Sequence, residues 1–192
     1  YCGEAQVTAT SENVNWSSLG ADNTDISDGF VQNTGTMNVT VNFTDDGNQD
    51  LVLNENDDLL YTEAGEPFST TSSLYLSGTG LGGVTTTDVS FKGTSTGGMS
   101  DEVENVQFRI NDIDASAGSW QDIITVTAQD ADGNPVTVTI TPAGNDVVAG
   151  NTITGAVGGD SEADAQGSAL VTIAGPVSDI SIAYANGDTG GQ

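Results

Sequence analysis

The chain contains no histidine, and only two of its 192 residues, Lys92 and Arg109, are basic. Without histidine the usual general base is missing, together with the common serine and cysteine triads and most zinc chemistry. Against 28 acidic residues, the two basic ones leave a formal net charge of −26, which excludes nucleic acid and anionic membrane surfaces as direct partners. We therefore expect a protein that is not an enzyme and whose natural partners are cations.

The chain also lacks a second cysteine and any long apolar run. Cys2 stands alone, so no disulfide can form within the chain. No apolar segment approaches the roughly 18 residues that a membrane-spanning helix needs. The abundance of Thr, Gly, Asn and Asp, with almost no Lys, resembles exported surface proteins of bacteria or archaea, so we expect an extracellular or cell-surface location. Adaptation to a salty habitat is the alternative explanation of the bulk acidity.

Short segments of alternating polarity recur between clusters of Gly, Asn and Asp, and helical periodicity is hard to find. Asp132 and Gly133 predict a tight hairpin turn between two strands rich in Thr and Val. We predict an all-β fold, a single antiparallel β-sandwich over residues 1–192 of about 9–11 strands, jelly-roll or immunoglobulin-like, with a flexible tail at 185–192. The best predicted strands are residues 5–10, 37–43, 73–76, 86–91, 103–110, 123–128, 135–141, 168–173 and 178–184, with further strands near 51–53 and 151–154.

Two carboxylates follow one predicted strand at positions that keep the alternation of its inward-facing side chains. Side chains two positions apart share a face, so the apolar series of residues 106–110 continues into Asp112 and Asp114. Asp122 precedes the next apolar series, and the three carboxylates converge if the two strands form an antiparallel hairpin. Calcium takes six to eight oxygen ligands and suits such a cluster. We predict a Ca²⁺ site at Asp112, Asp114 and Asp122; the alternative is a set of solvated or turn-forming acids.

Other candidate ligands carry a weaker signal. Asp130, Asp132 and Asn134 offer a second metal site, but Asp and Asn are preferred in tight turns for local reasons. The acidic run at residues 44–58 resembles a calcium loop loosely, and we predict a solvated loop for most of it. A pair of carboxylates could serve a glycosidase, but a chosen pair among 28 acids is a poor indicator.

Two tryptophans are weak candidates for ligand binding. Trp120 lies two residues before Asp122, and Trp16 follows an early polar stretch. An exposed Trp beside a calcium site can stack on a sugar ring, whereas a Trp more often closes the end of a core.

The second half of the chain carries several short motifs: F-x-I-x-D-I-D at residues 108–114, W-x-D at 120–122, D-x-x-G-N at 130–134, G-N-x-x-x-G at 150–155 and G-P-V-x-x-I-x-I-x-Y at 175–184. With these motifs, residues 84–190 resemble a β-sandwich module of large bacterial surface and secreted proteins, often found beside adhesin-like repeats or anchoring signals. The resemblance implies an extracellular module of structural or adhesive type, and it carries no catalytic site.

From these patterns we expect a non-enzymatic, calcium-stabilised extracellular β-sandwich of a cell surface, matrix or fibre. In one variant the chain is a fibre subunit, in which residues 1–12 are donated to the open sheet edge of a second copy; the alternative is that they form an edge strand of their own sandwich. Other surface proteins and glycans are further expected partners. The alternative function is a calcium-dependent carbohydrate-binding module of a secreted protein.

Overall fold

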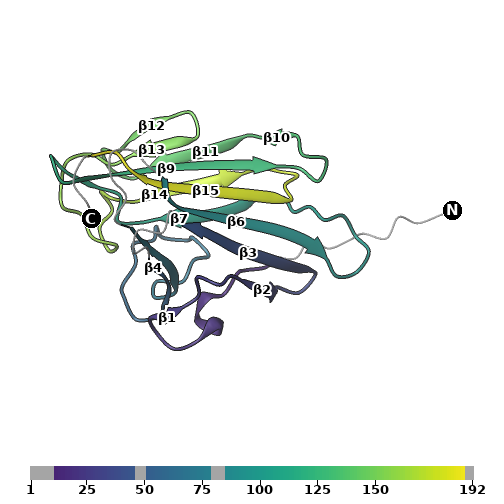
Figure 1. The fold of residues 1–192 in the computed structure, drawn as a ribbon. Helices are drawn as coiled ribbons and strands as arrows, with labels where there is room; N and C mark the ends of the chain where they lie inside the picture. The colour runs from purple at the N-terminus through teal and green to yellow at the C-terminus, as the bar shows by residue number, and fades with distance from the viewer. Residues whose placement is uncertain (1–10, 46–50, 79–84, 189–192) are drawn as a thin grey trace.

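The computed structural model describes residues 11–45, 51–78 and 85–188 of the chain (Figure 1). These residues form antiparallel sheets that pack together without any α-helix among them, which confirms the predicted sandwich-like all-β class. None of the helical structure in this part of the chain has the length and apolar character needed to cross a bilayer. The elements are η1 (Trp16–Leu19), β1 (Thr24–Asp25), β2 (Phe30–Asn33), β3 (Met37–Asp45), β4 (Leu51–Glu55), β5 (Ser73–Ser77), β6 (Thr85–Ser95), β7 (Val106–Ile110), β8 (Ala115–Ser116), β9 (Trp120–Gln129), β10 (Pro135–Val136), β11 (Val138–Pro142), β12 (Val147–Ala149), β13 (Thr152–Thr154), β14 (Ala169–Ile173) and β15 (Asp179–Asn186).

Most predicted strands are present, and several short ones add to them. β1, β8 and β12 are two or three residues long, too short for alternation to reveal them. The strand predicted at 135–141 divides into β10 and β11, and β13 matches the strand predicted near 151–154. The number of strands is therefore above the predicted 9–11. β15 extends through Asn186, which pairs with Asp122, so the predicted tail begins later than residue 185. Residues 1–10, the larger part of the segment predicted to be donated, and residues 189–192 lie outside the described residues.

The strands form one large sheet and two small ones. The large sheet has the order β12-β13-β9-β15-β6-β3-β2, with β8 and β10 also pairing with β9. β11, β14 and β7 form the second sheet, and β1, β4 and β5 form the third. The predicted hairpin is confirmed, since Pro135 pairs with Gln129 and Gly133 adopts a positive φ of 82°. Beyond Thr137 the chain leaves this hairpin and joins β14 of the second sheet as β11.

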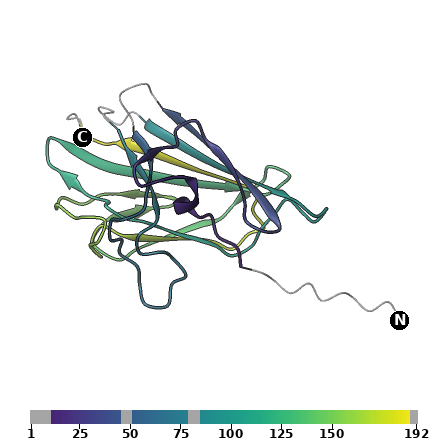
Figure 2. The same ribbon diagram turned by 90° about the horizontal axis from the view of Figure 1, so that it is seen from below.

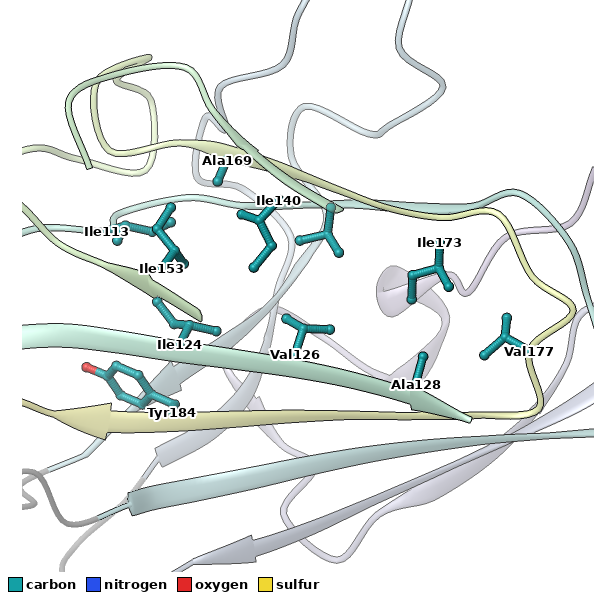
Figure 3. Packing of buried hydrophobic residues seen from close by; sticks show 11 residues of the cluster. Ile113, Ile124, Val126, Ala128, Ile140, Ile153, Ala169, Ile173, Val177 and Tyr184 are labelled. Atoms are coloured by element: carbon teal, nitrogen blue, oxygen red, sulfur yellow. The ribbon is translucent and has the colours of Figure 1, made fainter. Parts of the chain in front are cut away.

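The register of the large sheet gives it one continuous apolar face. Directly opposed residues of antiparallel strands lie on the same face, so a single row crosses five strands. Val41, Val89 and Val126 on this face are fully buried. Figure 3 shows how side chains of β9 and β15 meet Ile140 and Ile173 of the second sheet to form the main core. The row consists of Phe30, Val41, Phe91, Ile180 and Ala128.

The part of this face near β2 and β6 is covered by the N-terminal region. Trp16 of η1 makes edge-to-face contacts with Phe30, at 5.7 Å between ring centroids, and with Phe91, at 6.3 Å. Figure 2 shows η1, in purple, in front of the strands. Leu76 of β5 packs against the main core, so the third sheet also contacts that core.

An arginine fastens the long connection between β4 and β5 to the second sheet. Arg109 of β7 donates from Nε and Nη2 to the two carboxylate oxygens of Glu66, at 2.6 and 2.7 Å, and from Nη1 to Ser168 Oγ at 2.8 Å. Its side chain is only 4% exposed and lies over the ring of Tyr61. The pairing lowers the pKa of Glu66 and raises that of Arg109.

Candidate metal centre

Three carboxylates meet where β1 and β4 come together. Asp22, Glu55 and Asp57 each bring one oxygen to within 4.8 Å of the other two, and we call these residues the acidic trio. Glu55 is the last residue of β4 and is buried, whereas Asp57 is exposed. Because β1 and β4 run antiparallel with Thr24 opposite Asn54, the segment before β1 returns alongside the end of β4.

Asparagine side chains build this junction. Asn54 is fully buried, and its Oδ1 accepts the backbone N–H of Thr24 at 2.8 Å. The N–H of Asn56 donates to Asp22 Oδ1 at 2.8 Å, which fixes one carboxylate of the trio against the other strand. Asn23 has a φ of 59°, a left-handed conformation that asparagine tolerates better than most residues. The polar sequence therefore shapes the turn that carries Asp22.

The acids of the trio perturb one another. A hydrogen bond between the side chains of Asp22 and Glu55 raises the pKa of Glu55 to about 7, with burial and the charges of Asp22, Asp58 and Asp57 adding to the effect. The same hydrogen bond lowers the pKa of Asp22. Glu55 therefore holds a proton near neutral pH unless a cation takes its place, because crowded carboxylates cannot all ionise without compensation.

The donors of the acidic trio fit a hard divalent cation. All three are carboxylate oxygens, and two ligands on opposite sides of a Ca²⁺ ion at about 2.4 Å stand roughly 4.8 Å apart. The side-chain oxygen of Asn56, next to Glu55, is buried and has no hydrogen-bond partner. No other group of three carboxylates in the part of the chain that the structure describes meets the same distance limit.

The three aspartates predicted as calcium ligands lie elsewhere, at the crossing from β7 to β9. The predicted hairpin between these strands is wrong, because β7 belongs to the second sheet and β9 to the large one. Asp114 and Asp122 are nevertheless neighbours: the N–H of Asp114 donates to Asp122 Oδ2 at 3.0 Å, and the N–H of Asp122 donates to the Asp114 carbonyl at 3.0 Å. Both aspartates are buried.

Protein donors occupy the carboxylates of Asp114 and Asp122. Asp114 accepts the indole N–H of Trp120 at 2.9 Å and the backbone N–H of Asp160 at 3.0 Å. The hydroxyl of Tyr184 donates to Asp122 Oδ1 at 2.9 Å. These bonds hold together the crossing between the two sheets.

Asp112 does not follow the predicted inward parity. Its φ of 61° interrupts the alternation, so that its side chain is exposed while Ile113 enters the core. Partial desolvation and the charge of Asp114, followed by the charges of Glu162, Asp122 and Asp160, raise the pKa of Asp112 to about 6.

The weaker sequence candidates have local partners. Asp130 accepts backbone N–H groups of Asp132 and Asn134 and the side-chain amide of Asn134, and these bonds, the amide bond first, lower its pKa. This is the bonding of a turn-forming aspartate. Trp120 and Trp16 are both half-buried, Trp120 bonding Asp114 and Trp16 packing on phenylalanines.

The acidic trio was not predicted from the sequence. Residues 51–55 form β4, of which 51–53 were predicted as a strand, whereas Glu55, expected in a solvated loop, is buried at its end. The only signal was the acidic, amide-rich segment that follows an apolar strand, and its partner Asp22 lies over 30 residues earlier. Asp146 was also missed: it is buried, and its Oδ2 has no hydrogen-bond partner.

No family model, curated protein or solved structure matches the chain when it is compared with each of these sets. The description of the fold and of the candidate site therefore comes from this chain alone. It is an all-β protein with antiparallel sheets and an acidic trio that could hold a metal ion.

Proposed function

We propose that this chain is a non-enzymatic extracellular β-sandwich of structural or adhesive type, stabilised by calcium that Asp22, Glu55 and Asp57 bind. The observation that carries the proposal is the approach of three carboxylate oxygens to within 4.8 Å of one another at the β1–β4 junction. An ion there neutralises charge in a chain that carries a formal −26, and it replaces the proton that Asp22 and Glu55 otherwise share.

Calcium at the trio would stabilise a weak part of the fold. β1 has only two residues, and it joins the rest of its sheet through β4 alone. An ion shared by residues on both sides of this pairing holds the turn before β1 against the end of β4. Because η1 covers the apolar face near β2 and β6 and lies against β4, stabilising the junction stabilises that cover as well.

The two basic side chains and two carboxyl groups of the trio are engaged in structural contacts, which supports a non-enzymatic role. Lys92 pairs with Asp179 at 3.0 Å, and Arg109 is held by Glu66. The carboxyl groups of Asp22 and Glu55 hydrogen-bond to one another, closer than the about 5 to 9.5 Å that separates the two carboxyls of a glycosidase.

The proposed location and partners follow from the composition and from the resemblance over residues 84–190 to modules of bacterial surface proteins. A surface dense in carboxylates stays soluble outside the cell and does not adhere to anionic membranes. A second copy of the chain or other surface proteins are the partners that a structural role calls for.

Thermal unfolding in the presence and absence of calcium tests the proposal. An ion at 100 times its dissociation constant adds about 2.7 kcal/mol to the free energy of unfolding. In a chain of this length that raises the Tm by about 5 to 11 °C. The wild type should lose this increment in excess chelator and regain it when calcium is restored.

A pair of variants assigns the effect to the trio. Glu55→Gln keeps the shape and a hydrogen-bond donor toward Asp22 but removes a ligand charge, and it should shrink the rise in Tm that calcium produces. Asp28→Asn removes one charge from an exposed turn and should keep the full rise. An equal rise in both variants would refute the assignment to the trio.

A further inference from the structure

A second group of acids surrounds the rim where β8, β9 and β12 begin. Their charges act on one another: Asp160, Asp114 and Asp122 act on Asp146, and Asp114, Glu162, Asp122 and Asp160 act on Asp112. The two basic side chains of the chain are committed elsewhere, Lys92 to Asp179 and Arg109 to Glu63 and Glu66. The protein itself therefore supplies no basic side chain to neutralise this rim. We call these six residues the rim acids: Asp112, Asp114, Asp122, Asp146, Asp160 and Glu162.

Asp146 has a buried oxygen without a partner. The residue is 6% exposed; its Oδ1 accepts the N–H of Ala156 at 2.9 Å, whereas its Oδ2 is buried and meets no donor. Burying an unpaired carboxylate oxygen is costly, so such an atom calls for a ligand. Burial, and then the charges of Asp160, Asp114 and Asp122, raise the pKa of Asp146. The neighbouring charges are thus all of the sign that a cation would balance.

Backbone hydrogen bonds hold the second acid of the site in place. Asp160 lies on the loop between β13 and β14, and its own N–H donates to Asp114 Oδ2 at 3.0 Å. The same loop is tied to the strands by the N–H of Gly155, which donates to the Asp122 carbonyl at 2.8 Å, and by the N–H of Gly158, which donates to the Ala115 carbonyl at 3.1 Å. The approach is close: a Cβ on Gly155 would overlap the carbonyl of Asp114. The position of this loop is therefore fixed by the protein itself.

We propose that Asp146 and Asp160 bind a second hard divalent cation, of which Ca²⁺ is the natural example, inside the rim acids. The proposal goes beyond the acidic trio and shares no residue with it. Asp114 and Asp122 position the site, since protein donors occupy their oxygens, and Asp146 Oδ2 is the ligand that has no other partner.

The ligand set differs from that of the trio. Among the described residues the rim brings no three carboxylate oxygens within 4.8 Å of one another, so backbone carbonyls and water complete the coordination. Calcium accepts such mixed oxygen shells, and fewer charged ligands give weaker binding. The second site should therefore fill at a higher calcium concentration than the trio.

Native mass spectrometry of the full chain, titrated with calcium after removal of metals, tests the proposal. The wild type and Asp28→Asn should bind two ions, and Asp146→Asn and Glu55→Gln one each. The double variant of Asp146 and Glu55 should bind none. If Asp146→Asn binds as many ions as the wild type, the second site is refuted. If Glu55→Gln alone leaves the number unchanged, the trio fails and the second site stands.

Two additional measurements keep the result interpretable. Asp146→Asn should melt at or above the wild-type temperature in chelator, because it removes a buried charge with an unpaired oxygen. Should it fail to fold, Asp160→Asn on the loop serves instead. Terbium, which occupies calcium sites, should show tryptophan-sensitised luminescence in Glu55→Gln, where the trio holds no ion; adding Trp120→Phe should remove it, and adding Trp16→Phe should not. Loss only in Trp16→Phe would place the ion away from the rim and overturn the proposal.

Discussion

Replacing Arg109 by methionine should reduce the free energy of unfolding by about 3 kcal/mol, toward the lower end of the range for breaking a buried ion pair. The guanidinium makes two hydrogen bonds to Glu66 and one to Ser168, and its side chain is 4% exposed. Methionine keeps the aliphatic stem but leaves the Glu66 carboxylate without its cation. At 13% exposure this carboxylate recovers some hydration, which is why we choose the lower end of the range.

Urea unfolding at neutral pH, followed by tryptophan fluorescence, measures this loss. Lys92→Met is the matched control, because the Lys92–Asp179 pair is 60% and 38% exposed and should contribute at most about 1 kcal/mol. Adding Glu66→Gln to Arg109→Met should restore part of the stability, since it removes the orphaned charge. If Arg109→Met reduces the free energy of unfolding no more than Lys92→Met, the burial and geometry of the Arg109–Glu66 pair do not determine its contribution to stability.

Two further outcomes follow from the acids and the close packing. In chelator, the free energy of unfolding should rise as the pH falls from 8 toward 5. The pKa values of Glu55, about 7, and Asp112, about 6, lie above their ordinary values, so over this range the folded state binds these protons more tightly than the unfolded state. At lower pH the free energy of unfolding should fall again, because Glu66, whose pKa is lowered in the folded state, becomes protonated. A urea midpoint that falls steadily from pH 8 would contradict this. Gly155→Ala should reduce the free energy of unfolding by about 1 to 3 kcal/mol, because its Cβ would overlap the Asp114 carbonyl. Gly159→Ala, with open space around it, should leave the Tm nearly unchanged. Equal Tm values in these two variants would show that the loop moves to accommodate the added methyl group.

Local patterns in the sequence were sufficient to predict the class of fold. Alternation predicted β3, β9 and β15, and the Asp-Gly dipeptide predicted the turn between β9 and β10. These features depend on neighbours within a few residues. The proximity of Asp114 and Asp122 was also predicted, although it comes from the short antiparallel pairing of β8 with β9 and not from a hairpin of β7 with β9, which lie in different sheets.

The candidate sites depend on contacts that no local pattern contains. Asp22 reaches Glu55 through the pairing of β1 with β4, and Asp160 reaches Asp114 through a loop anchored on other strands. One left-handed residue, Asp112, was enough to break the alternation on which its inward orientation was predicted. Strand pairing and a single φ angle thus decided which carboxylates meet.

By itself the sequence determined the charge, the absence of histidine, the strand-forming alternation and the tight turn, because each is a property of composition or of adjacent residues. Only the tertiary structure decided which acids share a space. That outcome depends on sheet order, register and loop anchoring, which arise when distant segments bury one common apolar face.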